Sequence, residues 1–261
     1  MDNISAWQQA RHHDVTSRFG DLALEALIEL SGEGTIKDIP GSWKPNAKQG
    51  SGLIATFLQE EQVVNAQGSL ISGEISLEVD RDYVSFAGTK YAMATAQPGS
   101  PFLLAVYNEA HEALTKFSHI KCYDYNENHI YIGKYVQAKD QSFTFQHTGD
   151  VKLGSHQAGR QHQSKAVIEV DIEGITYQLR PFVSGDLDII VFRDATSNEE
   201  TYAVGRMLVI ENLNDNTVRL DFNKAFLPPC AFSPSFNCPM PPASNRIGCA
   251  IKAGEIDVVW K

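Results

Sequence analysis

Charged and thiol side chains gather in the last third of the chain, among residues typical of strands. Within residues 201–210, Arg206 stands in the middle of an alternating apolar face. Burying an unpaired guanidinium is prohibitively costly, so Arg206 needs a carboxylate or an anionic ligand. Asp194 and Asp221 are the candidate carboxylates. Two interpretations stay open: a structural ion pair that closes the end of a sheet, or a site for an anion.

Two cysteines lie in a proline-rich loop that follows these residues. Six of the eleven prolines fall between residues 228 and 242, which predicts a rigid loop of the kind on which sites are built. The spacing of Cys230 and Cys238 is too long for a zinc knuckle, so no metal site is predicted from the pair. A nucleophilic Cys230 would need a neighbouring charge such as Arg206 or Arg246. The alternative is that both thiols pack as small apolar side chains.

A three-stranded meander is predicted to position these residues, with strands at 187–193, 201–210 and 218–222. A tight turn at Asn198, a residue suited to the left-handed conformation, would pair Arg193 with Tyr202 and Ile189 with Arg206. The third strand places its apolar residues on one face and Arg219, Asp221 and Asn223 on the other. A second tight hairpin is predicted at Glu173-Gly174.

The whole chain is predicted to be mainly β. An N-terminal helical segment, broken into two helices at Gly20-Asp21, precedes antiparallel β-sandwich or barrel-like units, and a rigid Pro/Cys-rich loop lies near the C-terminus. Residues 32–52 are predicted to be a loop. We divide the chain into an N-terminal helical segment, a β-rich middle part and a C-terminal β domain, at residues 1–31, 53–125 and 126–261. No clean linker separates the two β parts, which leaves a shared core open.

Composition excludes several classes of protein. The 261 residues carry a net charge of −10 with scattered Lys and Arg, which argues against a nucleic-acid partner and a basic membrane patch. No apolar run reaches the roughly 18 residues of a membrane span. The polar N-terminus does not resemble a signal peptide, so we expect a cytoplasmic protein whose cysteines are thiols. Glycine-rich nucleotide loops and nucleophile elbows are missing, and no particular cofactor is indicated.

Three histidines mark a polar stretch at residues 146–165. His147, His156 and His162 would bind a metal if this stretch folded back on itself. A solvated loop is the favoured interpretation, because metal ligands usually lie on rigid elements.

Four segments of the chain resemble the C-terminal signature of the bacterial and archaeal domain of unknown function family 1684. They read FRDATSNEETYAVGR, LDFNKAFLPPCAFSP, NCPMPPASNR and IKAGE, and the likeness is dense over residues 188–255. The chain departs from the family in its N-terminal half, where a PDGWLSL-type stretch is missing. The resemblance implies an architecture and a site but no activity. It marks Arg193, Asp194, Thr196, Tyr202, Arg206, Asp221, Asn223, Cys230, Cys238 and Asn245.

The first functional hypothesis is a small-molecule site at the end of the 187–222 meander, with an anionic ligand and with catalysis left open. Arg193 and Arg206 would hold the anion, Asp221 and Asn223 would orient them, and the Cys230 loop would form one wall. Cys230 and Asp221 are the candidate catalytic residues. The candidate ligand-binding residues are Arg193, Asp194, Thr196, Tyr202, Arg206, Asn223, Cys238 and Asn245. The second hypothesis is a non-catalytic binding or interaction module whose polar signature only locks the loop onto the sheet.

Overall fold

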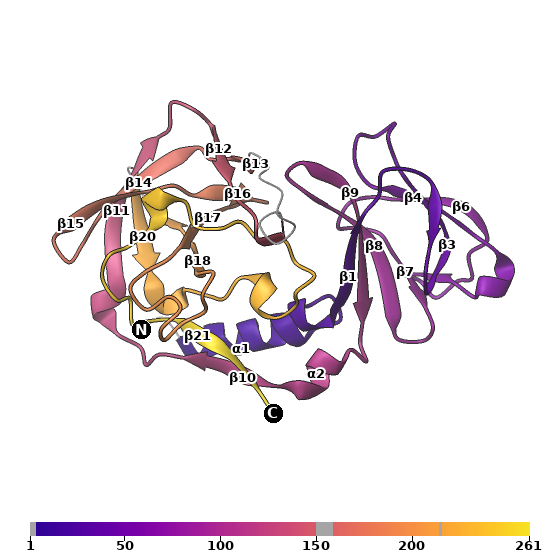
Figure 1. Cartoon of the computed structure of the whole chain (residues 1–261), viewed down its shortest axis with the longest axis horizontal. Helices are drawn as coiled ribbons and strands as arrows, with labels where there is room; N and C mark the ends of the chain where they lie inside the picture. The colour runs from indigo at the N-terminus through magenta and orange to yellow at the C-terminus, as the bar shows by residue number, and fades with distance from the viewer. Residues whose placement is uncertain (1–3, 150–158, 214–215) are drawn as a thin grey trace. The chain divides into compact units, whose positions relative to one another are not determined.

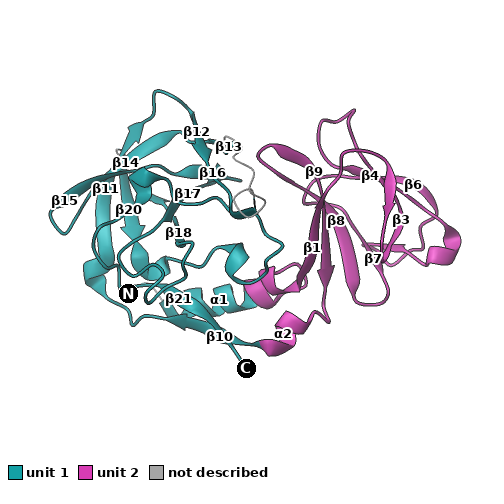
Figure 2. Cartoon of the chain, in the orientation of Figure 1, with its two compact units in different colours: residues 1–13, 117–261 teal, residues 14–116 magenta. Residues whose placement is uncertain are grey.

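The computed structural model describes residues 4–149, 159–213 and 216–261. The chain is mainly β with antiparallel sheets, as predicted. It folds into two compact units, which Figure 2 colours separately. Unit 1 comprises residues 1–13 and 117–261, and unit 2 comprises residues 14–116.

The N-terminal helix is shorter than predicted. Helix α1 spans Ile4–Thr16, and Gly20 then takes an extended conformation ahead of the short 3-10 turn η1, Asp21–Ala23. The second predicted helix is wrong, because Leu24–Glu29 forms strand β1 and pairs with β9, Ser100–Asn108. The spacing of its apolar residues fits both a helix and a strand, and hydrogen bonds to the neighbouring strand favour the strand.

Unit 2 consists of two antiparallel sheets, ordered β1-β9-β8-β7-β5 and β2-β3-β4-β6. The remaining strands are β2 Gly34–Ile36, β3 Ile39–Pro45, β4 Leu53–Phe57, β5 Val64–Asn65, β6 Gly73–Leu77, β7 Tyr83–Phe86 and β8 Lys90–Gln97. Short helical turns η2 Gln59–Glu61 and α2 Glu112–Lys116 complete the unit. Its core contains the fully buried Trp43 and Phe57. Residues 32–52 are therefore not simply a loop, since they supply β2 and β3.

Unit 1 contains the other strands, arranged around a second core (Figure 1). Its largest sheet has the order β15-β14-β11-β20-β19, next to smaller sheets β16-β17-β18, β10-β21 and β12-β13. The strands are β10 Phe117–Cys122, β11 Ile130–Gln137, β12 Ser142–Phe145, β13 Arg160–Gln163, β14 Ala166–Ile172, β15 Ile175–Leu179, β16 Phe182–Ser184, β17 Leu187–Phe192, β18 Arg206–Val209, β19 Glu211–Asn212, β20 Thr217–Asp221 and β21 Glu255–Trp260. The short helical turns are η3 Glu127–His129, η4 Phe222–Lys224, η5 Pro229–Ala231 and η6 Ala243–Asn245.

Of the predicted three-stranded meander, β17 and β18 pair with each other, but in a shifted register. The third strand, β20, lies instead in the larger sheet, between β11 and β19. Strand β17 pairs with β18 so that Phe192 lies opposite Arg206, whereas the prediction placed Ile189 opposite Arg206. The strand predicted at 201–210 begins only at Arg206, because the preceding residues form a longer turn. In that turn the carbonyl of Thr196 accepts the backbone N–H groups of residues 199, 200 and 201. Asn198 has the expected positive φ of 72°.

Two other local predictions agree with the structure. Glu173 and Gly174 both have positive φ and close the β14–β15 hairpin. In β20, Val218 and Leu220 are fully buried, while Arg219 lies on the opposite face with Asp221. No helix among the described residues is long and apolar enough to span a membrane.

Candidate functional site

Arg206 is completely buried and is held by protein atoms alone. Its Nη2 donates to Asp194 Oδ2 at 2.6 Å and to the carbonyl of Ile251 at 2.8 Å. Its Nη1 donates to the carbonyls of Ala253 and Glu255. The guanidinium thus ties β18 to the chain before β21, and it does not face a cavity. Of the two predicted partners, Asp194 forms the ion pair.

The carboxylate of Asp194 is the centre of this network. Besides Arg206, Oδ2 accepts the backbone N–H of Ile251 at 3.2 Å, and Oδ1 accepts the N–H and hydroxyl of Thr196. The Thr196 hydroxyl also lies 3.0 Å from that of Thr201. Burial lowers the pKa of Arg206, whereas the charge of Asp194 acts in the opposite direction. Such pairs resist disruption, because losing one partner strands a buried charge.

Asn245 provides a second buried junction. Its Nδ2 donates to the carbonyls of Arg180 and Val191, both at 2.8 Å, and its Oδ1 accepts the N–H of Arg180 at 2.7 Å. Its own carbonyl accepts the N–H of Arg193 at 3.1 Å. An amide side chain fits this place because it donates and accepts at once. Asn245 therefore joins the end of the proline-rich loop to β17 and β15.

Asn223 plays a comparable part at the end of β20. Its Oδ1 accepts the N–H of Asn126 at 2.8 Å, and its Nδ2 donates to the Asn126 carbonyl and to Asp221 Oδ1. Asp221 also accepts a bond from Arg219 at 3.2 Å. Asp221 and Asn223 were predicted to orient Arg193 and Arg206, but Asp221 contacts Arg219 instead, and Arg206 is bound by Asp194.

The thiols of Cys230 and Cys238 lie close together in the loop. The backbone N–H of Cys230 donates to Cys238 Sγ at 3.3 Å. The hydroxyl of Tyr202 donates to the Cys230 carbonyl at 3.0 Å and lies 3.8 Å from its Sγ. Arg206, one of the two arginines predicted to activate Cys230, is bound to Asp194 and to backbone carbonyls. Arg193 pairs through its backbone with Arg246, and its side chain forms no ion pair among the described residues.

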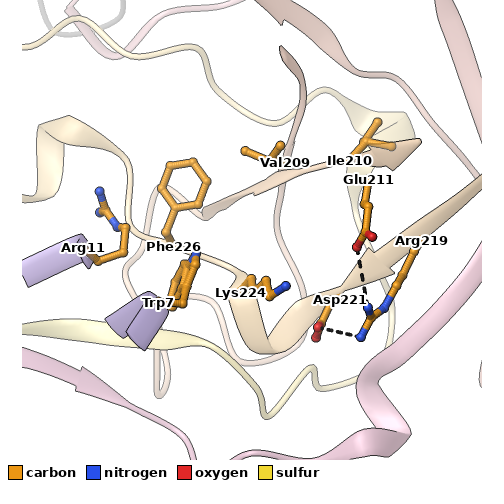
Figure 3. Close-up of a pocket in the computed structure, with 9 residues that line it drawn as sticks. All are labelled: Trp7, Arg11, Val209, Ile210, Glu211, Arg219, Asp221, Lys224 and Phe226. Atoms are coloured by element: carbon orange, nitrogen blue, oxygen red, sulfur yellow. Dashed lines mark hydrogen bonds and ion pairs between the residues drawn. The ribbon is translucent and has the colours of Figure 1, made fainter. Parts of the chain in front are cut away.

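A cavity of about 530 Å³ lies beside the end of the meander in unit 1. Figure 3 shows the nine residues that line it. They are Trp7 and Arg11 of α1, Val209, Ile210 and Glu211 around the β18–β19 junction, Arg219 and Asp221 of β20, Lys224 of η4, and Phe226. Of the predicted site residues, Asp221 alone lines this cavity.

The two ends of the cavity differ in character. At one end Trp7 and Phe226 lie close together beside Arg11 (Figure 3), whose guanidinium is 5.0 Å from the centre of the Phe226 ring. At the other end Arg219 contacts Glu211 at 3.6 Å and Asp221 at 3.2 Å. The lining thus combines aromatic surface with ionic groups.

Arg11 is fixed by a buried carboxylate behind the cavity. Its Nε lies 3.0 Å from Glu255 Oε1, and Glu255 Oε2 also accepts the N–H of Leu227 at 2.7 Å. Glu255 is only 1% exposed, so this ion pair holds α1 firmly to unit 1. Neither Arg11 nor Glu255 is among the predicted site residues, although Trp7 and Arg11 are four residues apart and so share one face of a helix.

His147 and His162 form a buried pair elsewhere in unit 1. Their Nε2 atoms are 2.8 Å apart, and His147 Nδ1 lies 2.9 Å from the carbonyl of Asn237. Because a carbonyl only accepts, His147 carries its proton on Nδ1, and His162 donates from Nε2. Burial lowers the pKa of His162 to about 4. His156 lies outside the described residues, and those residues contain no group of three or more potential metal ligands.

The fold and these sites define a mainly β protein whose polar signature is built into the interior of unit 1. A family model described as Protein of unknown function (DUF1684) matches residues 115–256, and the chain belongs to this family. The search of curated proteins found no match. A solved structure of an uncharacterised protein from Haloarcula marismortui is similar at 25% identity, with a TM-score of 0.43, over 55% of this chain and 77% of that one.

Proposed function

We propose that unit 1 binds a small anionic molecule that carries an apolar ring, in the cavity beside the end of the 187–222 meander. The observation that carries this proposal is the lining itself: three cationic side chains and two aromatic rings face one space of about 530 Å³. That volume falls within the usual range for small-molecule sites.

The aromatic end suits the ring of such a ligand. Trp7 and Phe226 offer apolar faces, and the Arg11 guanidinium extends this surface because planar cations stack on rings. Arg11 is already paired with Glu255, so it is positioned before any ligand arrives. Little side-chain entropy is then lost on binding.

The charged end suits the anionic group. Arg219 and Lys224 lie on the lining with the carboxylates of Glu211 and Asp221. The third lining cation, Arg11, is balanced by Glu255, which does not line the cavity. Arg219 is held between both carboxylates and acts as a fixed donor. A ligand carboxylate or phosphate would meet Lys224 and Arg219 together.

A different part is proposed for the residues that the family signature marks. Arg206, Asp194 and Asn245 are held by buried contacts to protein atoms and do not line the cavity, so they position its walls and do not touch the ligand. This corresponds to the hypothesis of a structural lock, now confined to the buried network.

The test is a thermal-shift screen with matched ligands: aromatic carboxylates and phenyl phosphate against their neutral amide and alcohol counterparts. A ligand at 100 times its Kd adds about 2.7 kcal/mol of stability, enough to raise the melting temperature by several degrees. We expect stabilisation by at least one anionic member, its loss in Lys224→Gln, and a weaker effect at high salt.

Lys134→Gln is the matched control, because Lys134 is exposed in the same unit and lies outside the cavity lining. It should respond to ligand as the native protein does. The proposal fails if no anion stabilises the protein, if neutral analogues do so equally, or if the two lysine variants lose the response alike.

A further inference from the structure

The proline-rich loop brings the thiols of Cys230 and Cys238 close together. Cys230 is half-buried and Cys238 is 4% exposed. The Cys238 sulfur is 3.3 Å from the backbone nitrogen of Cys230. Since that nitrogen is about 1.5 Å from the Cys230 Cα, the Cys238 sulfur lies within about 5 Å of the Cys230 Cα. Rotation about the Cys230 Cα–Cβ bond is then the main movement needed to join the sulfurs.

Thr148, which lies outside the proline-rich loop, holds Cys238 in place through two hydrogen bonds. The backbone N–H of Cys238 donates to Thr148 Oγ1 at 3.1 Å, and its carbonyl accepts the N–H of Thr148 at 3.0 Å. On the Cys230 side, Pro228 and Pro229 fix the backbone that enters η5. Neither cysteine therefore depends on a loose segment for its position.

A donor is placed next to the more accessible sulfur. The Tyr202 hydroxyl lies 3.8 Å from Cys230 Sγ. Burial, followed by the nearby Cys230, raises the pKa of Tyr202, so the hydroxyl keeps its proton at neutral pH. This proton is donated to the Cys230 carbonyl at 3.0 Å, and rotation of the hydroxyl would turn it toward a thiolate that forms at Cys230.

The two other cysteines lack this arrangement. Burial raises the pKa of Cys122 to about 11 and also raises that of Cys249. Thiols with raised pKa values react slowly at neutral pH. They serve as internal references for the pair in the loop.

We propose that Cys230 and Cys238 are a dithiol that small organic disulfides oxidise to a disulfide within the loop. In the first step the Cys230 thiolate attacks one sulfur of the oxidant, which forms a mixed disulfide and expels one thiolate. Cys238 then attacks the Cys230 sulfur and expels the second. The protein loses two electrons and two protons, and the oxidant leaves as two thiols.

The test treats the reduced protein with oxidised glutathione at neutral pH without denaturant, then unfolds and alkylates it, and maps the peptides by mass spectrometry. We expect a peptide that links Cys230 to Cys238, no lasting glutathione on Cys230, and alkylated Cys122 and Cys249. A persistent glutathione adduct on Cys230, or no reaction in the loop while the reference thiols react, would overturn the proposal.

Variants assign the order of attack. Cys238→Ser should stop at a glutathione adduct on Cys230, because the resolving sulfur is gone, whereas Cys230→Ser should leave the buried Cys238 unmodified. Cys249→Ser is the control and should form the linked peptide as the native protein does. If Cys238→Ser does not fold, the native peptide map still decides, since a loop without the linkage contradicts the proposal.

Discussion

At the residue scale, the most informative side chain is Arg206, because its charge is fully enclosed by the protein. Four of its hydrogen bonds end on three carbonyls and one carboxylate, and its Nε–H finds no acceptor among the described residues. Its guanidinium also lies 5.3 Å from the centre of the Phe192 ring. An anion has no path to this group in the described structure, so its role is to join chain segments.

Replacing Arg206 with Met should therefore destabilise unit 1 by about 3–5 kcal/mol, because Asp194 is left buried without its partner. The measurement is urea unfolding followed by NMR of fluorotryptophan, in which Trp7 and Trp260 report on unit 1 and Trp43 on unit 2.

Arg246→Met is the control for this variant, since it makes the same chemical change at an exposed position and should cost less than about 0.5 kcal/mol. Equal midpoints for Arg206→Met and the native protein would show that the buried pair does not stabilise unit 1.

At the scale of elements, the start of β21 depends on a close approach of backbone to backbone. Gly254 has a φ of 78°, and a Cβ placed on it would lie 2.5 Å from the carbonyl oxygen of Ala225 and 2.6 Å from that of Phe222. Only glycine fits this place, next to Glu255 and its bond to Arg11. The glycine thus allows the strand to meet η4, on which Lys224 is presented to the cavity.

Gly254→Ala and Gly174→Ala form a matched pair that separates crowding from backbone conformation. Gly174 has nearly the same φ, 79°, but a Cβ there meets nothing within 4 Å. Gly174→Ala should lower the free energy of unfolding by about 1–2 kcal/mol, because alanine is strained in the left-handed conformation. Gly254→Ala should lower it clearly more, because its Cβ also meets the two carbonyl oxygens. Unfolding midpoints of unit 1 provide the measurement, and equal losses in the two variants would contradict the steric argument.

At the scale of the whole molecule, the two units differ in their buried histidines. His129, His147 and His162 are buried in unit 1, whereas residues 14–116 contain one histidine, His111. Burial lowers the pKa of His129 and lowers that of His162 to about 4. A response to acid should therefore be concentrated in unit 1.

The direction in which pH changes the stability of unit 1 follows from proton binding by His162. Above about pH 6.5 His162 is neutral in both the folded and the unfolded chain, so its full contribution to the stability of unit 1 is present. Below that pH the unfolded chain binds a proton that the folded unit excludes until about pH 4, so stability falls. His162 alone should cost unit 1 about 2 kcal/mol between pH 7 and pH 5.

The measurement compares urea midpoints of the two units at both pH values with the fluorotryptophan signals. His162→Gln keeps a donor for His147 but does not titrate, so it should remove most of the loss of stability between pH 7 and pH 5. His119→Gln, at an exposed position, should leave that loss unchanged. An undiminished loss in His162→Gln would assign the acid response to other groups.

The sequence alone determined the features that depend on neighbouring residues in the chain. Alternation in β20, the left-handed Asn198 and the Glu173-Gly174 hairpin follow from local geometry and were predicted correctly, whereas the last four residues of β17 are buried on both faces. The closely spaced matches to the family's motifs over residues 188–255 were enough to indicate the family. The need of Arg206 for a carboxylate or an anionic ligand also followed from the sequence, because the cost of burying a charge does not depend on the fold; the sequence left open which of the two it would be.

Only the tertiary structure decided which partner each group found. Residues 24–29 suit a helix or a strand, and pairing with β9 made them a strand. The choice of Asp194 over Asp221 for Arg206 depended on a turn that shifted the register by several residues. The cavity joins α1 to the meander across some 200 positions, and no local pattern records such a contact. Distant contacts of this kind are set by how the elements pack, since packing energy depends on which surfaces meet and not on their separation in the chain.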